Sequence, residues 1–188
     1  MTRIVAGAAK GRRLAVPAQG TRPTSERARE ALFNSLRALL DLDAAAVLDL
    51  YAGSGAVGLE ALARGAGSAT FVEADPRACQ VLRRNIDAVG LPGAHLERRA
   101  VAAWLGLGPS AIDTAPFDLV FADPPYAVPD EQVAAVLAGL AVPGWLRDGA
   151  IVVVERGSQG VELPWPDGIT GVQRRRYGDG VLWYGRRT

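Results

Sequence analysis

The sequence contains one cysteine, Cys79, and one histidine, His95, among its 188 residues. A single cysteine excludes an intrachain disulfide, and one residue of each kind excludes a zinc site built from cysteine and histidine ligands. A Cys–His nucleophile pair would require these two side chains to meet. We therefore interpret Cys79 as a small residue on a helix face and His95 as a loop or strand-edge residue, and we expect no metal.

Long apolar stretches and a leader-like start are also missing. No run approaches the roughly 18 apolar residues of a membrane-spanning helix, and residues 1–7 lack the apolar core of a signal peptide. We therefore expect a cytoplasmic protein with no membrane partner. With 49% hydrophobic residues in a chain of 188, we expect one domain with a small appendage, present as a monomer.

An apolar run at residues 47–52 leads into a glycine-rich loop. Gly53, Gly55 and Gly58 fit the pattern G-x-G-x-x-G, and the flanking residues predict a strand before the loop and a helix after it. Glu73 ends the next apolar run, 20 positions after Gly53. This arrangement is typical of folds that bind a nucleoside cofactor and hold its ribose hydroxyls with the acidic residue.

Asp49, just before the loop, discriminates among nucleoside cofactors. A carboxylate there opposes the pyrophosphate of a nicotinamide or flavin nucleotide. S-adenosylmethionine has an ammonium group and no phosphate. Asp49 and the glycine loop for its methionine part, with Glu73 for its ribose, therefore make a consistent site. The alternative is purely structural: the glycines allow close packing of helix on strand, and Asp49 caps the helix.

The net charge of +1 hides a segregation along the chain. Residues 1–37 carry a net charge of +6, residues 38–173 carry −9 and residues 174–188 carry +4. If the two ends of the chain lie on one side of the fold, they form a cationic surface beside an anionic body, the electrostatic pattern of a polyanion binder. The alternative is solvated charge on unrelated surfaces.

The basic N-terminal region contains two short alternating runs, residues 3–7 and 12–17, which predict a β-hairpin with basic residues at its tip. A hairpin this small is marginal on its own, so we expect it to be mobile until it binds its substrate. A helix capped by Thr24 or Ser25 follows. We expect this helix to cover the core and to leave four side chains at its edges: Arg22, Arg27, Arg29 and Asn34.

Strand and helix patterns alternate through the rest of the chain. Strands are predicted at residues 68–73, 94–98, 117–122 and 149–155, and helices at residues 76–89, 100–105 and 131–140. The last two strands, residues 172–177 and 181–186, flank Gly178-Asp179-Gly180, which suits a tight turn. The fold class is therefore α/β and Rossmann-like: a seven-stranded, mostly parallel sheet with helices on both faces, an antiparallel C-terminal hairpin and the small N-terminal hairpin.

Asp123-Pro124-Pro125-Tyr126 follows the predicted central strand, at the edge where open α/β sheets place their sites. The exocyclic amine of a nucleobase is a poor nucleophile because its lone pair is delocalised into the ring. The Asp123 carboxylate and the Pro124 carbonyl can accept its two N–H bonds, while two prolines keep the turn rigid. Tyr126 offers a face for an extruded base. The alternative is a proline-rich turn that only ends a strand.

The loop from Asp49 to Gly55, together with Asp123-Pro124-Pro125-Tyr126, resembles the class I S-adenosylmethionine-dependent amino-methyltransferases of nucleic acids. The N-terminal region, with Lys10-Gly11-Arg12, Arg22-Pro23-Thr24 and residues 29–34, is similar more narrowly to the bacterial RsmD-type methyltransferases. The resemblance covers almost the whole chain and is weakest at residues 106–116. It implies methylation of the exocyclic N2 of a guanine in 16S ribosomal RNA, with S-adenosylmethionine as cofactor and the small ribosomal subunit as partner.

The resemblance and the motifs together assign residues to three roles and the chain to two parts. The expected parts are an RNA-binding arm at residues 1–20 and a methyltransferase domain at residues 21–188. A DNA adenine N6-methyltransferase, which usually needs a separate target-reading domain, and a non-catalytic RNA-binding module remain as alternatives. The assigned residues are, for catalysis, Asp123, Pro124, Pro125 and Tyr126; for the cofactor, Asp49, Tyr51, Gly53, Ser54, Gly55, Glu73 and Ala100; and for RNA, Arg3, Lys10, Arg12, Arg13, Arg22 and Arg27.

Overall fold

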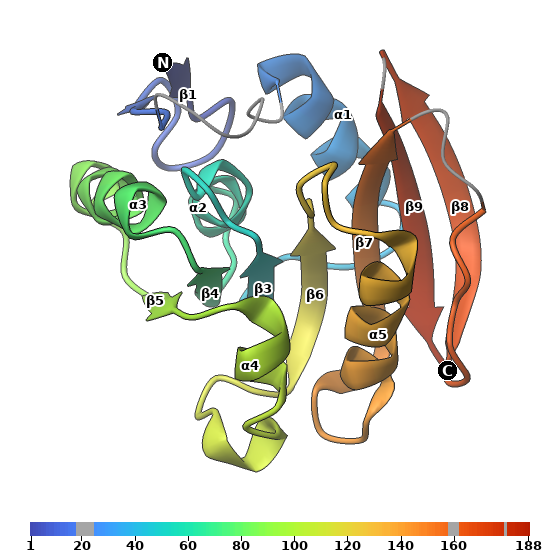
Figure 1. Cartoon of the computed structure of the whole chain (residues 1–188). Helices are drawn as coiled ribbons and strands as arrows, with labels where there is room; N and C mark the ends of the chain where they lie inside the picture. The colour runs from blue at the N-terminus through green and yellow to red at the C-terminus, as the bar shows by residue number, and fades with distance from the viewer. Residues whose placement is uncertain (18–24, 158–161, 179) are drawn as a thin grey trace.

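The computed structural model describes residues 1–17, 25–157, 162–178 and 180–188. The predictions for Arg22, Thr24 and Asp179 lie outside these residues. In the described part, one seven-stranded sheet is covered by helices on both faces, and a two-stranded hairpin lies beside it (Figure 1). This confirms the predicted α/β fold.

From β3 to β7 the helices and strands alternate, as the sequence predicts. In chain order they are β1 (Thr2–Arg3), β2 (Arg13–Leu14), α1 (Glu26–Leu36), β3 (Ala46–Leu50), α2 (Ala56–Ala63), β4 (Ser68–Glu73), α3 (Pro76–Val89), β5 (Ala94–Arg98), α4 (Val101–Leu105), the short 3-10 helix η1 (Pro109–Ala111), β6 (Phe117–Ala122), α5 (Asp130–Ala141), β7 (Leu146–Gly157), β8 (Ile169–Tyr177) and β9 (Gly180–Arg187).

The strand order in the main sheet is β5-β4-β3-β6-β7-β9-β8. The strands from β5 to β7 are parallel, whereas β9 inserts between β7 and β8 and runs antiparallel to both. The carboxyl ends of β6 and β7 point to the upper edge in Figure 1, where the N-terminal hairpin lies. The strand order reverses between β3 and β6, and open α/β sheets bind ligands at the carboxyl ends of the strands at such a point.

Each face of the sheet has its own hydrophobic core. Helices α1, α2 and α3 cover one face through side chains that include Phe33, Leu59 and Leu82. Helices α4 and α5 cover the other, where Trp104 and Trp145 lie 4.8 Å apart, measured between ring centroids. Burial on both faces explains why β3 and β6 are nearly continuous apolar runs in the sequence.

The predicted element limits agree closely in the parallel half and less well at the N-terminus. Helix α3 and strands β4, β5 and β6 have the predicted limits, and Ser25 caps α1 by accepting from the Ala28 amide. The hairpin strands are only two residues each, shorter than predicted. Within the described residues, no helix is both long and apolar enough to cross a bilayer.

Candidate functional site

The glycine loop leaves the carboxyl end of β3 through a strained residue. Tyr51 has a φ of +58°, a left-handed conformation that costs a tyrosine about 1–2 kcal/mol. A backbone hydrogen bond to the neighbouring strand β4 fixes the turn: the Ala52 amide donates to the Val72 carbonyl at 3.2 Å. Such strain persists only where the surroundings fix it, and it is common at functional sites.

Asp49 is buried at the end of β3 and contacts the helix that follows the loop. Its Oδ2 accepts from the Gly58 amide at 2.9 Å, in the first turn of α2, as a capping carboxylate does. A Cβ at Gly58 would lie 2.4 Å from the Phe71 ring, so glycine is required for this close packing. Both contacts of the purely structural interpretation are therefore present: Asp49 caps the helix, and Gly58 allows close packing of the helix on the strand. The second carboxylate oxygen of Asp49 remains for a ligand.

Glu73, at the end of β4, fixes the other side of the loop. Its Oε2 accepts from the Gly53 amide at 2.8 Å, and its Oε1 accepts from the Asp75 amide at 2.8 Å. Each oxygen has a further lone pair, so Glu73 can still accept from a ribose hydroxyl. Ala100 lies farther along the same edge, exposed at the start of α4.

The Asp-Pro-Pro-Tyr turn leaves β6 next to the glycine loop. Because Leu50 pairs with Ala122, Asp123 is level with Tyr51, and the Asp123 amide donates to the Leu50 carbonyl at 3.5 Å. Pro124 is buried, whereas the Tyr126 side chain is 77% exposed. The two predicted half-sites are thus adjacent, with an aromatic ring open to solvent at their rim.

Tyr126 lies over the backbone of β7. A Cβ at Gly157 would be 3.0 Å from Tyr126 Cε1, so the missing side chain leaves space for the ring. Arg156, the residue before Gly157, donates from Nη2 to the Val128 carbonyl at 3.2 Å. The same Nη2 forms an ion pair with Asp130 Oδ1 at 2.6 Å. Arg156 therefore tethers the segment after the turn to β7, and Gly157 leaves room for the Tyr126 ring.

Carboxylates gather around the point where the two loops meet. Burial raises the pKa of Asp49 to about 8, the Gly58 amide opposes this, and Glu73 adds to it. Burial also raises the pKa of Asp123 to about 8, with further increases from Glu155 and Asp49 and an opposing effect of Arg156. A site in which four carboxylates repel one another favours a cation. It therefore fits the sulfonium and ammonium groups of S-adenosylmethionine, and not a pyrophosphate.

The N-terminal hairpin is docked on the helices that flank the glycine loop. Glu60 of α2 accepts from the Val5 and Ala6 amides at 2.7 and 3.0 Å. Asn85 of α3 exchanges two hydrogen bonds with the Ala15 backbone and donates to the Ser54 carbonyl at 2.8 Å. A single buried amide thus joins the hairpin, α3 and the cofactor loop.

The predicted RNA-binding residues of the hairpin have different surroundings. Arg3 forms an exposed ion pair with Glu26 at 3.0 Å, and Arg12 Nη1 donates to the Ala88 carbonyl at 2.8 Å. Lys10, Arg13 and, on α1, Arg27 are exposed. The positive side chains near the hairpin tip therefore face outward, next to α3.

The prediction that Arg29 lies exposed at the edge of α1 is wrong. Its side chain is buried, and Nη2 donates to Thr2 Oγ1 at 3.0 Å and to the Arg3 carbonyl at 2.6 Å. Arg29 falls on the same face of the helix as Leu32, Phe33 and Leu36. It uses its charge to satisfy the backbone of β1 and not to bind a ligand.

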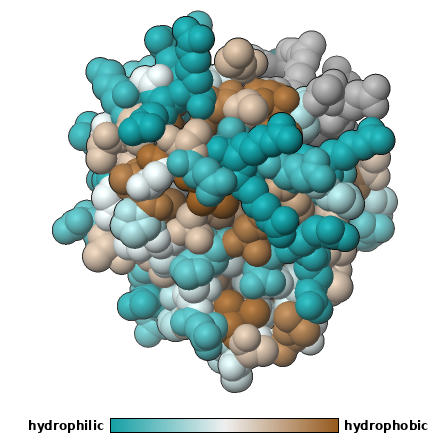
Figure 2. Space-filling view, turned by 90° about the vertical axis from the view of Figure 1, so that its left-hand side faces the viewer, coloured by the Kyte–Doolittle hydropathy of each residue, from teal (hydrophilic) through white to brown (hydrophobic). Residues whose placement is uncertain are grey.

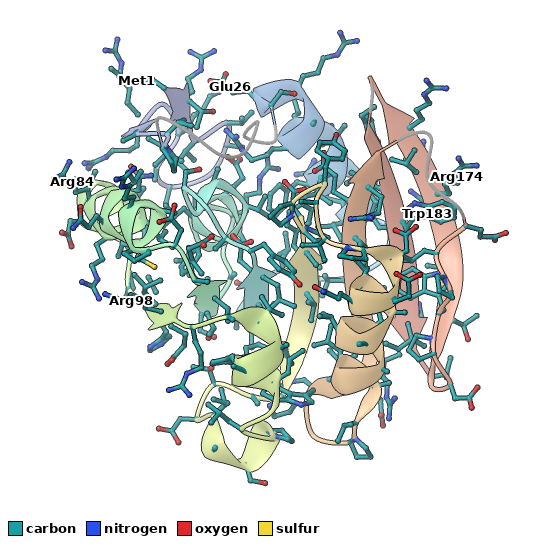
Figure 3. The ribbon with its side chains drawn as sticks, in the orientation of Figure 1. Met1, Glu26, Arg84, Arg98, Arg174 and Trp183 are labelled. Carbon is teal, nitrogen blue, oxygen red and sulfur yellow. The ribbon has the colours of Figure 1, made fainter. Side chains whose placement is uncertain are left out.

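Helix α3 extends the basic surface beyond the hairpin. Arg83 and Arg84 are exposed on this helix, and Arg98 is exposed at the end of β5. Figure 2 shows strongly hydrophilic side chains across the upper half of this face, and Figure 3 shows Arg84 and Arg98 on the same flank of the molecule. Residues 38–173 carry a net charge of −9, but these three arginines of that segment add positive charge to the surface beside the hairpin.

Sequence reasoning missed four residues that support the site: Glu60, Asn85, Arg156 and Gly157. Asn85 did carry a signal, because it follows Ala78 and Leu82 on the buried face of α3, where a polar residue requires partners. Glu60 lies in a helix whose residues are all buried. Nothing in the sequence singles out Arg156 or Gly157, since their role depends on the pairing of β6 with β7.

Comparison with known proteins identifies the family to which the chain is related. The family model described as "Conserved hypothetical protein 95" matches residues 2–186. Ribosomal RNA small subunit methyltransferase D of Escherichia coli K12 is 38% identical over 156 residues, which are 81% of this chain and 73% of that protein. The putative rRNA methyltransferase YlbH of Bacillus subtilis is 33% identical over 188 residues, covering 98% of this chain and 99% of that protein.

Solved structures agree with the sequence relatives. The putative methyltransferase yhhF from Escherichia coli has a TM-score of 0.83 and 30% identity, covering 99% of this chain and 97% of that chain. A hypothetical protein of Thermus thermophilus, TTHA0928, has a TM-score of 0.80 and 35% identity, covering 98% of each chain. A putative methyltransferase, SMU.776, solved with S-adenosylhomocysteine, has a TM-score of 0.68 at 13% identity, covering 85% of this chain and 48% of that chain, and shows the common fold.

These findings confirm the predicted family, the class I methyltransferase fold and S-adenosylmethionine as the cofactor. In this structure, Asp49 and Glu73 hold the glycine loop between them, and Asp123 faces it from the neighbouring strand. The chain therefore belongs to the S-adenosylmethionine-dependent methyltransferase family that the model "Conserved hypothetical protein 95" describes and that includes ribosomal RNA small subunit methyltransferase D.

Proposed function

We propose that this protein methylates the exocyclic N2 amine of a guanine in 16S ribosomal RNA of the small ribosomal subunit. The observation that carries the proposal is the position of Asp123 and Pro124, adjacent to the cofactor loop and at its level. The names of the relatives, ribosomal RNA small subunit methyltransferase D, support the substrate. The basic hairpin surface at the same edge is suited to RNA phosphates.

When bound, S-adenosylmethionine supplies a methyl group made electrophilic by its sulfonium. The second oxygen of Asp49 would hold the ammonium of the methionine part, and Glu73 would accept from the ribose hydroxyls. Gly53, Ser54 and Gly55 would shape the loop around the methionine part, Tyr51 would fix its start, and Ala100 would contact the adenine. Since the pocket is lined by carboxylates, it favours the charged cofactor over its neutral product.

The target amine is held on the other side of the pocket. The Asp123 carboxylate and the Pro124 carbonyl accept its two N–H bonds, Pro125 keeps the turn rigid, and the base stacks on Tyr126. The bound cofactor would supply the methyl group to the amine nitrogen held in this way, and Asp123 would take the proton that the amine releases. Because burial raises the pKa of Asp123 to about 8, the carboxylate form that accepts these bonds and the proton increases as pH rises through this value. Positioning of this kind is worth about 7–11 kcal/mol.

Methyl transfer from radiolabelled S-adenosylmethionine tests the proposal. Small ribosomal subunits from cells that lack the protein, the free 16S RNA and duplex DNA would be offered as substrates, and the labelled nucleoside identified by mass spectrometry. We expect N2-methylguanosine in RNA, formed at least about a hundredfold more slowly when the Asp123→Ala variant is used. Label in DNA adenine would support a DNA methyltransferase, and RNA binding without any label would support a non-catalytic binding module.

A further inference from the structure

A second group of exposed arginines lies at the opposite flank of the site from the hairpin. Arg174, Arg175 and Arg176 follow one another near the end of β8, which is the last strand in the sheet order. In the described part of the chain, none of the three forms an ion pair. Side chains alternate along a strand, so Arg174 and Arg176 project from one face of this sheet edge and Arg175 from the other. Three adjacent charges of one sign on an edge strand, with no ion pair among the described residues, require an explanation.

The strand register brings these arginines level with the catalytic turn. Arg175 pairs with Leu182 on β9, and Leu182 pairs with Glu155 on β7. Glu155 follows Val154, the partner of Ala122, so it is level with Asp123. Three strand spacings separate Asp123 from Arg175, a distance of about 14 Å. At 3.4 Å per nucleotide along a stacked strand, this corresponds to about four nucleotides.

The other C-terminal arginines serve a different purpose. Arg186 donates to the Gly149 and Leu39 carbonyls at 3.3 and 3.1 Å, and Arg187 donates to the Ala141 and Gly168 carbonyls at 3.0 and 3.3 Å. Both lie toward the end of β9, away from the site. They hold the backbone together, so the basic C-terminal segment contains two structural arginines and three outward-facing ones.

The side chain of Arg174 is held in place by an aromatic neighbour. Its guanidinium lies 4.8 Å from the centroid of the Trp183 ring, a stacking that fixes the cation while leaving its N–H groups at the surface. Figure 3 shows Arg174 and Trp183 on one side of the molecule and Arg84 and Arg98 on the other. The carboxyl ends of the parallel strands lie between these two basic flanks.

We propose that Arg174, Arg175 and Arg176 form a second RNA-phosphate surface, which holds the strand on the far side of the target nucleotide from the hairpin. The inference rests on the proposed function and extends it. Extruding a base is costly because it loses its stacking and pairing. Phosphate contacts on both sides fix the position of the strand while the base enters the pocket between them.

A different explanation of the same arginines makes the opposite prediction. Charged side chains on an edge strand prevent it from pairing with another sheet. If this is their only role, replacing them leaves RNA binding unchanged and promotes association of the protein with itself. The two explanations therefore differ in the salt dependence of RNA binding and in the oligomeric state of the variant.

The test is the double substitution Arg175→Gln/Arg176→Gln, which retains Arg174 on Trp183. RNA affinity would be measured by titration over a range of salt concentrations, with a fragment of 16S RNA that the wild type methylates. We expect affinity to fall at least about tenfold and the slope of log binding constant against log salt to decrease by about 1.4, or 0.7 for each lost contact. S-adenosylmethionine affinity and melting temperature should not change.

The matched control is Arg147→Gln. The Arg147 side chain is 56% exposed and lies near the start of β7, at the end of the strand away from the proposed site. It should leave the salt slope unchanged. A hairpin variant, Lys10→Ala/Arg13→Ala, provides the comparison: if it lowers the slope and the β8 variant does not, the second surface is refuted while the proposed function stands. If the wild type methylates neither free 16S RNA nor the small ribosomal subunit, so that no such fragment is found, the proposed function itself fails. An unchanged slope with a dimeric β8 variant would assign the arginines to edge protection.

Discussion

The cofactor loop and the catalytic turn leave neighbouring strands at the same edge of the sheet, yet they are held in different ways. The cofactor loop is bound by Asp49 and Glu73, through amides of Gly53 and Gly58, and packs on a buried ring. The catalytic turn ends in the exposed Tyr126 and is tethered mainly through Arg156. The proposed cofactor half is therefore fixed by internal contacts, and we expect the proposed half for the target base to be completed by its substrate.

Removing the carboxylate of the catalytic turn gives the largest expected effect. Asp123→Ala should lower the rate of methyl transfer a hundredfold or more, about 2.7 kcal/mol, because the amine loses both its orientation and its proton acceptor. Since the cofactor half does not depend on this residue for its shape, S-adenosylmethionine affinity should remain within about threefold of the wild type. Single-turnover kinetics and calorimetry measure the two quantities. Near-normal turnover would refute the role of Asp123.

A pair of glycine substitutions compares the rigidity of the two halves directly. Gly58→Ala places a methyl group 2.4 Å from the buried Phe71 ring, whereas Gly157→Ala places one 3.0 Å from the exposed Tyr126 ring. Phe71 has no space to move, so Gly58→Ala should lower the free energy of unfolding by about 1–3 kcal/mol. Tyr126 can rotate into solvent, so Gly157→Ala should change stability by less than about 0.5 kcal/mol and reduce methyl transfer.

Thermal or urea unfolding of both glycine variants, with turnover measured in parallel, decides this comparison. Equal stability losses would show that the catalytic turn is packed as firmly as the cofactor loop. A normal rate for Gly157→Ala would show that the Tyr126 ring does not need its place on β7.

The pKa of Asp49 makes cofactor binding sensitive to pH. Burial raises this pKa to about 8 in the free protein, and the cation of the cofactor should lower it again in the complex. In the free protein, the Asp49 carboxyl is mostly protonated at about pH 7 and mostly ionised at about pH 9. The affinity for S-adenosylmethionine should therefore rise about tenfold over this range. Calorimetry in buffers of different ionisation enthalpy should detect release of a proton on binding. Asp49→Asn should bind more weakly and lose most of this pH dependence.

The raised pKa of Asp49 also makes the stability of the folded protein depend on pH, with a trend opposite to that of cofactor affinity. Because the folded state retains the Asp49 proton up to about pH 8 and the unfolded state releases it near its ordinary value of about 3.9, the folded state binds more protons between these values. Stability of the protein without cofactor should therefore decrease as pH rises through this window. In Asp49→Asn, the contribution should be absent.

The smallest expected effect concerns the tether of the catalytic turn. Arg156 is 14% exposed and pairs with an Asp130 that is 56% exposed, so Arg156→Gln should change the free energy of unfolding by about 1 kcal/mol or less. Loosening the turn should still reduce turnover several-fold while S-adenosylmethionine affinity is kept. Asp130→Asn removes the ion pair and leaves the bond to the Val128 carbonyl, so it should have a weaker effect than Arg156→Gln.

The sequence predicted most of the sheet and the two loops because these depend on local patterns. Apolar runs located β4 and β6, proline and glycine marked the ends of α3, and the motifs placed Asp49 and Asp123 at adjacent strand ends. The order of β8 and β9 was not predictable, since an antiparallel hairpin can be added to a sheet through either strand. The roles of Arg29 and Arg156 also depend on contacts between distant segments, which leave no mark in the local pattern.

The hydrogen bonds of the N-terminal hairpin also constrain how the chain folds as it is synthesised. Val5 and Ala6 require Glu60, and Ala15 requires Asn85, partners that are 55, 54 and 70 positions away. Segments that pair over such separations form late, because the intervening chain must first be brought together. The hairpin leaves the ribosome before α3 and must therefore wait for that helix before it can dock. During that interval Ile4 and Leu14, both buried in the finished core, are exposed, which makes the nascent hairpin a segment for chaperones to bind.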